Sequence, residues 1–578
     1  MNIFNTYLQY INETILILLE DNNIVLENDN LLEKIVVEVP KDKKFGDLST
    51  NVALVLSSTF KTKPLDVAKK LKLKFENHHD FCDVSIANPG FINFTLQEDV
   101  WQKLLFNLLE TGEWKYEQFC KNNNLNLEFV SANPTGPLHA GHARGAVVGD
   151  CLARILKLVG FNVTREYYIN DAGNQIDVLI KSVQLRYLEQ LSGINANIPE
   201  NFYPGAYLIT IAKKIKNEYD DTLEKLDYEN FFLTVNQLVI NEILNLIKKD
   251  LLNLGVDMDI FSSEKSIIKK GFLDKVLNIL KNNKLIYEGI LEKPKGKADL
   301  DEWEPRPQLL FKSSLFGDDS DRALKKSDGS WTYFANDMAY HLYKIEKTKG
   351  NLINILGADH LGYLKRIESA VKALSSNKIK LVNKVCAIVH LMNDNKKIKM
   401  SKRSGNFIML SDLINDLGKD VIRFIMLTRK NEQVLEFDFK KALAQNKDNP
   451  VFYVHYAYAR CKSIVKNSNI FDQKFSFEEI KMLKDNNELS LIKLISQWPR
   501  VVELSAKHME PHRICYYLID LASEFHSLWN KGKVDESLKF INVNDTSITK
   551  SKLALISSVM LTIKSGLNIL SINPMEEM

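Results

Sequence analysis

The sequence predicts a doubly wound α/β fold with a parallel, Rossmann-like sheet, preceded by an α+β domain and followed by an all-α domain. Three observations support this fold class. Residues 124–192 read as a strand, a glycine-containing loop and a helix, which is how a nucleotide-binding sheet usually begins. Short apolar runs at 308–316, 352–356 and 384–391 resemble buried parallel strands. Every periodic segment beyond about residue 445 has helical spacing.

The chain has 578 residues, which suggests three to five domains at roughly 100–200 residues each. We expect an N-terminal domain at 1–110, an α/β domain at 116–445 and a helical domain at 446–578. A Lys- and Asn-rich stretch at about 193–300 reads as a helical insertion into the α/β domain. The hydrophobic content of 45% and charged content of 26% are typical of a soluble globular protein. The net charge of +3 is too small to indicate a nucleic-acid partner by itself.

Local patterns place the main elements within these domains. Leu125, Leu127 and Phe129 alternate as in a strand, and the helix after the loop ends at Gly160. The apolar run at 352–356 leads into a predicted helix near 361–374. In the last domain, the segments with the clearest helical spacing are 451–466 and 512–530.

Cysteine spacing and the N-terminal stretch bound the cellular setting. The six cysteines show no C-x-x-C pair, so we do not expect a structural zinc site. We expect these cysteines to be reduced thiols in a cytoplasmic protein. Leu8, Ile11, Ile15 and Leu18 share one helical face near the N-terminus, and Glu13 interrupts the run. This pattern predicts an amphipathic helix rather than a signal peptide or a membrane span.

The strongest chemical signal is H-A-G-H at 139–142, directly after the predicted strand and loop. His139 and His142 lie three apart and share one side of a helix's first turn. A helix N-terminus offers N–H groups and the positive end of the helix dipole, which suit phosphate. Gly141 has no side chain, so a flat ring can lie against the backbone there. The alternative is a solvated helix start with incidental histidines, against which the strand–loop–helix setting argues.

The second signal is the basic loop K-M-S-K-R-S-G-N at 399–406, which follows a predicted strand and turn. Lys399 and Lys402 on such a glycine-containing loop can hold pyrophosphate as charge builds on the leaving group. In a lysine-rich chain, the alternative is a solvated surface loop. The presence of H-A-G-H upstream favours the catalytic interpretation.

Together the two motifs resemble the signatures of class I aminoacyl-tRNA synthetases. In that family the H-x-G-H histidines and the second lysine of the loop stabilise the transition state of adenylate formation. The resemblance therefore implies catalytic roles for His139, His142, Lys399 and Lys402. Arg403 stands where many members of the family have Ser.

Further segments resemble the arginyl-tRNA synthetase branch of that family. They are E-F-V-S-A-N-P-T-G-P-L-H-A-G-H-A-R-G at 128–145, Y-Y-I-N-D-A-G-N-Q at 167–175, Y-F-A-N-D at 333–337, G-A-D-H at 357–360 and N-P-V-F-Y-V-H-Y-A-Y-A-R at 449–460. The sequence G-D-L-S-T-N at 46–51 resembles the branch's extra N-terminal domain, which binds the tRNA elbow. The resemblance is faint over 193–300 and after 465. The C-terminal I-N-P-M-E-E-M replaces the family's usual Ala-Pro-Glu-rich tail.

The resemblance implies two small-molecule sites. The residues implied for ATP are Pro134, Gly136, His139, Gly141, His142, Gly357, Asp359, His360, Lys399, Met400, Ser401 and Lys402. The residues implied for arginine are Glu128, Ser131, Asn133, His139, Tyr333, Asp337 and His360. The chemistry agrees, because a planar guanidinium favours carboxylate partners. Taken alone, Asp337 would read as a surface acid or a helix cap.

An aromatic and basic mixture at 452–463 is suited to stacking unpaired anticodon bases. The alternative is an aromatic stripe of the domain core. The residues implied for tRNA are Asn51, Tyr453, Tyr456, Tyr458, Arg460 and Met578.

The implied activity is that of a ligase that activates L-arginine with ATP and transfers it to the 3′-terminal adenosine of tRNA(Arg). We expect Mg²⁺ to accompany ATP, without a dedicated metal site in the protein. We also expect the protein to be a cytoplasmic monomer that has no membrane partner. One alternative is a class I synthetase for another amino acid, against which the N-terminal domain and Y-x-x-x-D segment argue. A tRNA-binding paralogue without activity would not need His139, His142 and Lys402. A small H-x-G-H nucleotidyltransferase would be far shorter.

Overall fold

The structure is a computed structural model with two compact units, each described here by itself. One unit comprises Met1–Glu117, Phe452–Met509 and Arg513–Met578, and the other comprises Gln118–Val451 and Glu510–His512. The residues described are 2–24, 29–195, 197–291, 306–393, 396–397, 408–470 and 474–578.

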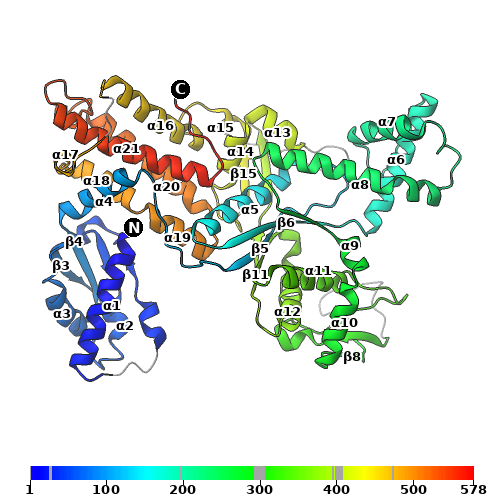
Figure 1. The fold of residues 1–578 in the computed structure, drawn as a ribbon, viewed down its shortest axis with the longest axis horizontal. Helices are drawn as coiled ribbons and strands as arrows, with labels where there is room; N and C mark the ends of the chain where they lie inside the picture. Colours follow the sequence, from blue (N-terminus) through cyan, green and yellow to red (C-terminus); the bar gives the residue numbers. More distant parts are fainter. Residues whose placement is uncertain are drawn as a thin grey trace. The chain divides into compact units, whose positions relative to one another are not determined.

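A five-stranded, all-parallel sheet forms the centre of the second unit (Figure 1). Its strands lie in the order β12-β11-β5-β6-β7, so that the chain starts in the middle and winds outward to both edges. The order reverses between β5 and β11, which is the switch point where such sheets bind ligands. This confirms the predicted doubly wound fold. The strands are β5 (Asn124–Glu128), β6 (Asn162–Ile169), β7 (Ile260–Ser263), β11 (Asn351–Gly357) and β12 (Leu381–Cys386).

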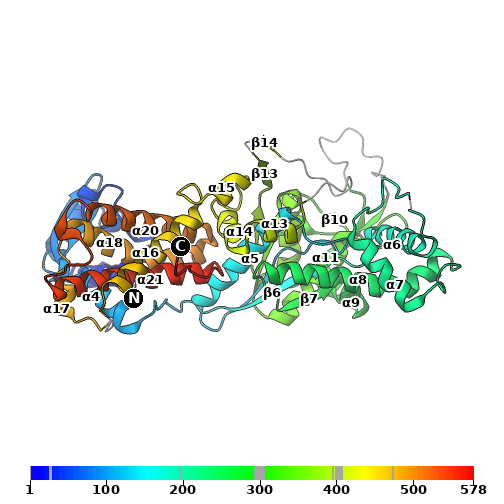
Figure 2. The same cartoon turned by 90° about the horizontal axis from the view of Figure 1, so that it is seen from above.

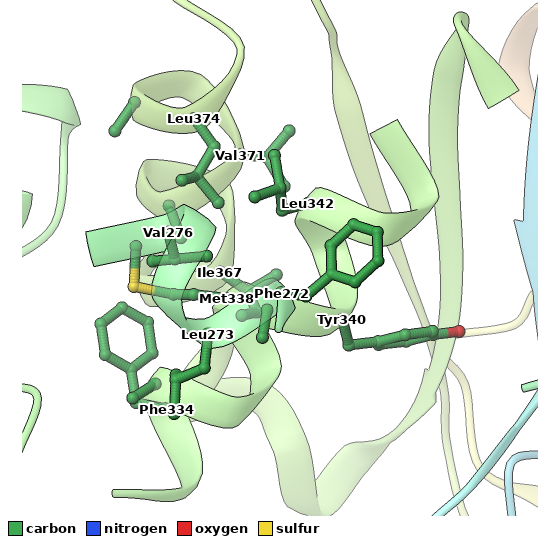
Figure 3. Packing of buried hydrophobic residues seen from close by; sticks show 14 of the residues in the cluster. Phe272, Leu273, Val276, Phe334, Met338, Tyr340, Leu342, Ile367, Val371 and Leu374 are labelled. Atoms are coloured by element: carbon green, nitrogen blue, oxygen red, sulfur yellow. The ribbon is translucent and has the colours of Figure 1, made fainter. Parts of the chain in front are cut away.

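The helix α5 (Ala140–Leu158) packs against this sheet, and small residues permit the close approach. A Cβ at Gly149 would lie 2.2 Å from the Phe129 ring, so only glycine fits there. A second packed layer consists of α10 (Phe272–Asn282), α11 (Tyr333–Thr348) and α12 (Leu364–Leu374). Figure 3 shows its core, in which Met338, Ile367 and Val371 interdigitate.

The region 193–300 differs from the helical insertion that the sequence predicts. Its first part is helical, with α7 (Tyr207–Tyr219) and α8 (Tyr228–Asn253) packed on α6 (Asn174–Ser192). Its second part contains β7, the edge strand of the main sheet, and β8 (Ile286–Gly289). Strands of four residues are too short to show a period of two.

One of the three expected parallel strands is wrong, and another is divided between two strands that are each parallel to a neighbour. The run at 308–316 contains β9 (Gln308–Phe311), which pairs antiparallel with β8 and with β10 (Arg322–Ala323). The run at 384–391 is divided between β12 and β13 (Val389–Asn393), which lies in another sheet with β14 (Lys396–Lys397) and β15 (Leu435–Asp438). An apolar run reports burial but not the partner strand, which explains why the run at 308–316 pairs antiparallel instead.

The first unit joins the two ends of the chain. Its N-terminal part is an antiparallel sheet, β1-β2-β4-β3, covered by helices, which confirms a mixed α and β region. The amphipathic prediction for its first helix is also confirmed, because Ile11 and Ile15 are fully buried. The elements are α1 (Ile3–Asp21), β1 (Val37–Glu38), β2 (Leu48–Thr50), α2 (Val52–Leu56), α3 (Pro64–Phe75), β3 (Phe81–Ala87), β4 (Phe91–Leu96) and α4 (Glu98–Thr111).

The C-terminal part of this unit is helical throughout, as predicted, and its long helices lie side by side in Figure 2. The helix α4 packs on three of them, and the Trp498 indole donates to the Tyr116 hydroxyl at 2.9 Å. The helices are α16 (Pro450–Asn467), α17 (Phe477–Ile480), α18 (Asn486–Ser496), α19 (Trp498–His508), α20 (His512–Lys531) and α21 (Thr546–Ile569).

The remaining elements are short. They are η1 (Asp29–Lys34), η2 (Lys43–Phe45), α9 (Glu264–Lys269), η3 (Ser313–Phe316), η4 (Ala358–Tyr363), α13 (Leu410–Leu417), α14 (Lys419–Met426), α15 (Phe439–Leu443) and η5 (Glu536–Leu538). Among the described helices, only α21 is long and apolar enough to cross a membrane, with a mean hydropathy of 1.2. In its most apolar window 72% of the residues are buried inside the protein, as expected for a core helix.

Candidate functional site

The H-A-G-H motif caps and begins α5 at the carboxyl end of β5. The Nδ1 of His139 accepts from the Gly141 N–H at 3.1 Å, and the Nδ1 of His142 accepts from the His139 N–H at 3.2 Å. A neutral histidine that accepts at Nδ1 carries its proton on Nε2, the type of group that donates to phosphate oxygens. The two rings stack with centroids 3.8 Å apart. A Cβ at Gly141 would lie 2.9 Å from the His139 ring, so the glycine makes room for that ring.

The loop between β5 and α5 begins with strained backbone. Val130 has φ of +71° and Ser131 has φ of +39°, a region that β-branched residues rarely adopt. Side chains hold this turn in place. The Ser131 hydroxyl donates to Glu128 at 3.0 Å and accepts from the Tyr168 N–H at 3.0 Å. The Tyr167 hydroxyl donates to the carbonyl of Ala132 at 2.7 Å.

The backbone of the H-A-G-H motif is paired with the residues that follow the basic loop. Ala140 N–H donates to the Ile408 carbonyl at 3.0 Å, and Leu410 N–H donates to the Leu138 carbonyl at 2.9 Å. The residues directly after the basic loop therefore lie against the H-A-G-H motif. The basic loop itself, with Lys399, Met400, Ser401 and Lys402, lies outside the described residues.

Glu128 ends β5 and is buried in a polar network. Its Oε2 accepts from Lys344 Nζ at 2.7 Å and from the Tyr340 hydroxyl at 3.0 Å. In Figure 3 that hydroxyl points away from the apolar cluster. Lys344 also donates to Asn354 at 2.7 Å. Burial alone would raise the pKa of Glu128, but Lys344 and the hydrogen bonds outweigh it and lower the pKa. Glu128 is thus ionised and already has a cation partner.

Asp337 and Glu264 are two further acids in this region. Their pKa values are raised, whereas that of Glu128 is lowered. Burial, together with the nearby Glu264 and Glu128 carboxylates, raises the pKa of Asp337 to about 7, although the Tyr363 hydroxyl donates to it. Burial also raises the pKa of Glu264, which accepts from Asn336 Nδ2 at 3.1 Å. No described lysine or arginine forms an ion pair with Asp337 or Glu264. Two such carboxylates make a site for a cationic ligand.

The other predicted small-molecule residues line the same end of the sheet. Asn133 donates to Gln175 at 2.9 Å, and Pro134 and Gly136 continue that loop. Tyr333 begins α11, one turn before Asp337, and is 60% exposed. The remaining residues are all exposed, namely Gly357 at the end of β11 and Asp359 and His360 in η4.

The predicted tRNA residues fall into two groups. In the N-terminal part, the Asn51 amide bonds to backbone groups of Val36 and Lys34, and so braces its own domain. The C-terminal group lies on or beside a pocket of about 970 Å³ lined by α16, α20 and the chain end. Among its lining residues are Tyr456, Arg460, Trp529, Phe540 and Met578.

Within the C-terminal group, the aromatic residues have different environments. Tyr456 is 38% exposed. The Arg460 guanidinium lies over its ring, with the guanidinium carbon 4.2 Å from the Tyr456 ring centroid. Tyr453 is partly buried and packs against His526, with centroids 4.7 Å apart. Tyr458 is only 5% exposed and belongs to the helical core.

Comparisons with known proteins identify the family. The family model "tRNA synthetases class I (R), catalytic domain" matches residues 105–472, and "Arginyl tRNA synthetase N terminal domain" matches 6–96. The chain belongs to the arginyl-tRNA synthetase family. A third family model, "DALR anticodon binding domain", matches residues 454–578.

Individual family members resemble the chain along its whole length. It is 46% identical to the arginine–tRNA ligase of Ehrlichia chaffeensis over 583 residues, covering 100% of both chains. It is 44% identical to that of Rickettsia prowazekii over 585 residues, again covering 100% of both chains. The solved putative arginyl-tRNA synthetase of Campylobacter jejuni superposes with a TM-score of 0.71 at 31% identity, covering 84% of this chain and 100% of that chain.

The sequence reasoning missed several residues of this site. Glu264 follows a strand too short to recognise, and Tyr363 lies in a 3₁₀ turn after the G-A-D-H segment. Lys344 gave no signal in a lysine-rich chain, although its side chain is fully buried. Lys344 shares its helix face with Tyr340 and the polar His341, so hydrophobic spacing gave no clue to its burial.

Proposed function

We propose that this protein activates L-arginine with ATP to give arginyl-adenylate and pyrophosphate, and then transfers arginine to the 3′-terminal adenosine of tRNA(Arg). The observation that carries the proposal is a pair of acids, the partly buried Asp337 and the buried Glu264. Asp337 lies close enough to interact with Glu128, which ends the strand whose loop leads to His139 and His142. A cation pocket beside a phosphate-binding helix N-terminus suits a cationic amino acid and a nucleotide.

In the activation step, the arginine carboxylate attacks the α-phosphorus of ATP in line and pyrophosphate leaves. His139 and His142 donate to phosphate oxygens through Nε2. Gly136 and Gly141 make room for the Tyr207 and His139 rings, which place the loop and the first histidine. Lys399 and Lys402 neutralise the departing pyrophosphate, with Mg²⁺ accompanying the nucleotide. Holding both substrates in line supplies much of the acceleration. Pro134, Gly357, Asp359, His360, Met400 and Ser401 complete the proposed ATP site.

The arginine pocket combines charge with shape. Asp337 receives the guanidinium, and Tyr333 lies one turn before it on α11. Glu128, Ser131, Asn133 and His360 complete the proposed pocket. Because Glu128 is paired with Lys344, its charge is largely offset in the absence of arginine. The electrostatic selection of arginine therefore falls mainly on Asp337.

The tRNA is bound by the other unit. The pocket beside α16 combines aromatic rings with cations, the arrangement that stacks and neutralises unpaired nucleotides. Tyr453, Tyr456, Arg460 and Met578 are the proposed contacts there, with Asn51 in the N-terminal domain. The buried Tyr458 supports the helix that carries them. The protein acts in the cytoplasm as a monomer.

The deciding experiment is ATP–pyrophosphate exchange run with each of the 20 amino acids, with and without tRNA. We expect exchange with arginine alone among them, and only near-background exchange when tRNA is omitted. Exchange supported best by another amino acid would refute the arginine assignment. Vigorous exchange without tRNA would refute the tRNA requirement but leave the substrate assignment standing.

A further inference from the structure

The loop that leads into the H-A-G-H motif has few means of holding its own shape. Its residues 133–138 read N-P-T-G-P-L, so two of six positions are prolines without an N–H group. Within it, Thr135 N–H donates to the Asn133 carbonyl at 2.7 Å. The position of the loop, and of His139 directly after it, must therefore be fixed by contacts from elsewhere.

Those contacts come from three consecutive helices, one side chain from each. From α6, the Gln175 amide oxygen accepts from Asn133 at 2.9 Å. From α7, the Tyr207 hydroxyl donates to the Thr135 carbonyl at 2.7 Å. From α8, the Asp250 carboxylate accepts from the Leu138 N–H at 3.0 Å in a buried setting. The loop is thus held along its length, up to the residue before His139.

Two glycines, Gly136 in the loop and Gly205 just before Tyr207, allow the Tyr207 ring to contact the loop. A Cβ at Gly136 would lie 2.8 Å from the Tyr207 hydroxyl oxygen, so the ring tip rests directly against the loop backbone. A Cβ at Gly205 would lie 2.1 Å from the same ring, so glycine there lets the side chain fold back over its own turn. Gly136 is therefore required for this contact, whatever it does for ATP.

The three helices form one body, as both Figure 1 and Figure 2 show. The Tyr228 hydroxyl at the start of α8 donates to the carbonyl of Asp177 in α6 at 3.1 Å. The Arg186 guanidinium of α6 donates to the Pro204 carbonyl ahead of α7 at 3.1 Å. The helix α8 has 26 residues and is about 39 Å long at ~1.5 Å per residue, so it runs from this body to the loop.

We propose that Gln175, Tyr207 and Asp250, named here the loop clamp, are positioning residues that hold the signature loop in the geometry adenylate formation needs. The inference rests on the proposed function. None of the three side chains needs to touch ATP or arginine. Their effect passes through the loop backbone to His139 and His142. The helices α6 to α8 are thereby assigned a part in catalysis.

The test compares variants of the full-length protein in ATP–pyrophosphate exchange with arginine and tRNA. Tyr207→Phe keeps the ring and removes one hydrogen bond, so kcat should fall about fivefold while KM for arginine and for tRNA stays unchanged. Asp250→Ala should lower kcat by about tenfold or more, because it leaves a buried N–H without its partner. Asp250→Asn retains an acceptor oxygen and should recover most of that loss. Tyr219→Phe, at the other end of α7 beside Glu218, is the matched control and should match wild type.

The double variant Tyr207→Phe/Asp250→Ala distinguishes one clamp from two unrelated contacts. If both side chains hold the same loop, the combined loss in kcat should be smaller than the product of the single losses. Independent, multiplicative losses would overturn the proposal, as would a kcat within twofold of wild type for both single variants. If Asp250→Ala does not fold, Tyr207→Phe and Gln175→Ala decide the question by the same criterion. A wild-type protein without arginine-dependent exchange would overturn the proposed function and this inference with it.

Discussion

At the scale of single residues, the ionisation of Asp337 should set the pH dependence of arginine use. Its pKa is raised to about 7, chiefly by burial, so the protonated fraction grows as pH falls below 7. The guanidinium stays charged throughout and binds the carboxylate form. We therefore expect KM for arginine to be flat above pH ~8 and to rise by up to about tenfold per pH unit below 7. Initial rates over pH 5.5–9 in the Asp337→Asn variant should lack this rise.

The charge of Asp337 should also decide between arginine and citrulline. Citrulline has nearly the shape of arginine but carries a neutral urea, so wild type should reject it by roughly 10⁴ in kcat/KM. Asp337→Asn preserves size and removes charge, and should weaken arginine use by at least ~30-fold, because a buried guanidinium then lacks its partner. The gap between arginine and citrulline should narrow, while lysine stays a poor substrate without the planar fork. Unaltered discrimination against citrulline in Asp337→Asn would make this residue a structural acid.

Lys402 should act on the transition state more than on ground-state binding. Replacing it with Ala should slow adenylate formation by ~10²–10³, the usual loss for one such donor, and should change ATP affinity little. Single-turnover rates with saturating ATP measure the first quantity, and equilibrium binding of ATP measures the second. A variant with the wild-type single-turnover rate would remove Lys402 from the mechanism.

At the scale of elements, a buried ion pair fastens α5 to α14 and so fixes the helix that bears the histidines. Arg423 Nη2 lies 2.5 Å from Asp150 Oδ2, and both side chains are fully buried. Asp150→Ala should lower the free energy of unfolding by about 3–5 kcal/mol, since it removes the buried carboxylate that Arg423 contacts. Urea unfolding followed by circular dichroism should show the loss. The double variant Asp150→Ala/Arg423→Met should recover much of it, and no recovery would mean that packing rather than charge is responsible.

Also at this scale, the order of strand, loop and helix at 124–158 was predictable because its signals are local. Hydrophobic alternation and two prolines lie within the segment itself, and Gly160 lies just after it. The histidines of H-A-G-H were predictable for the same reason. The pairing of β9 with β8, the edge position of β7 and the approach of Glu264 to Asp337 depend on contacts between distant segments. Periodicity carries no information on such contacts, so only the fold reveals them.

At the scale of the whole molecule, the matches to the catalytic-domain model and to the anticodon-binding-domain model fall mainly in different compact units. The acids and histidines lie in the unit built on the parallel sheet, whereas the aromatic and basic pocket lies in the unit that joins both chain ends. The chain passes between the units at Glu117–Gln118 and Val451–Phe452, and the short segment Glu510–His512 also belongs to the unit with the parallel sheet. Substitutions in the pocket should accordingly affect tRNA use and leave arginine binding unaffected.

Tyr456 provides the sharpest test of this division, because its ring is half-exposed at the pocket and stacked under Arg460. Stacking of a base on an aromatic ring contributes about 1–3 kcal/mol, so Tyr456→Ala should raise KM for tRNA by roughly 5- to 100-fold. KM for arginine should stay within twofold of wild type. Tyr456→Phe is the matched control, since it keeps the ring and removes only the hydroxyl that accepts from Arg460. Aminoacylation rates at varied tRNA concentration give both constants. Equal effects of the Ala and Phe variants would show that the hydroxyl, rather than the ring face, serves tRNA binding, and no effect of either would place Tyr456 outside the tRNA contact.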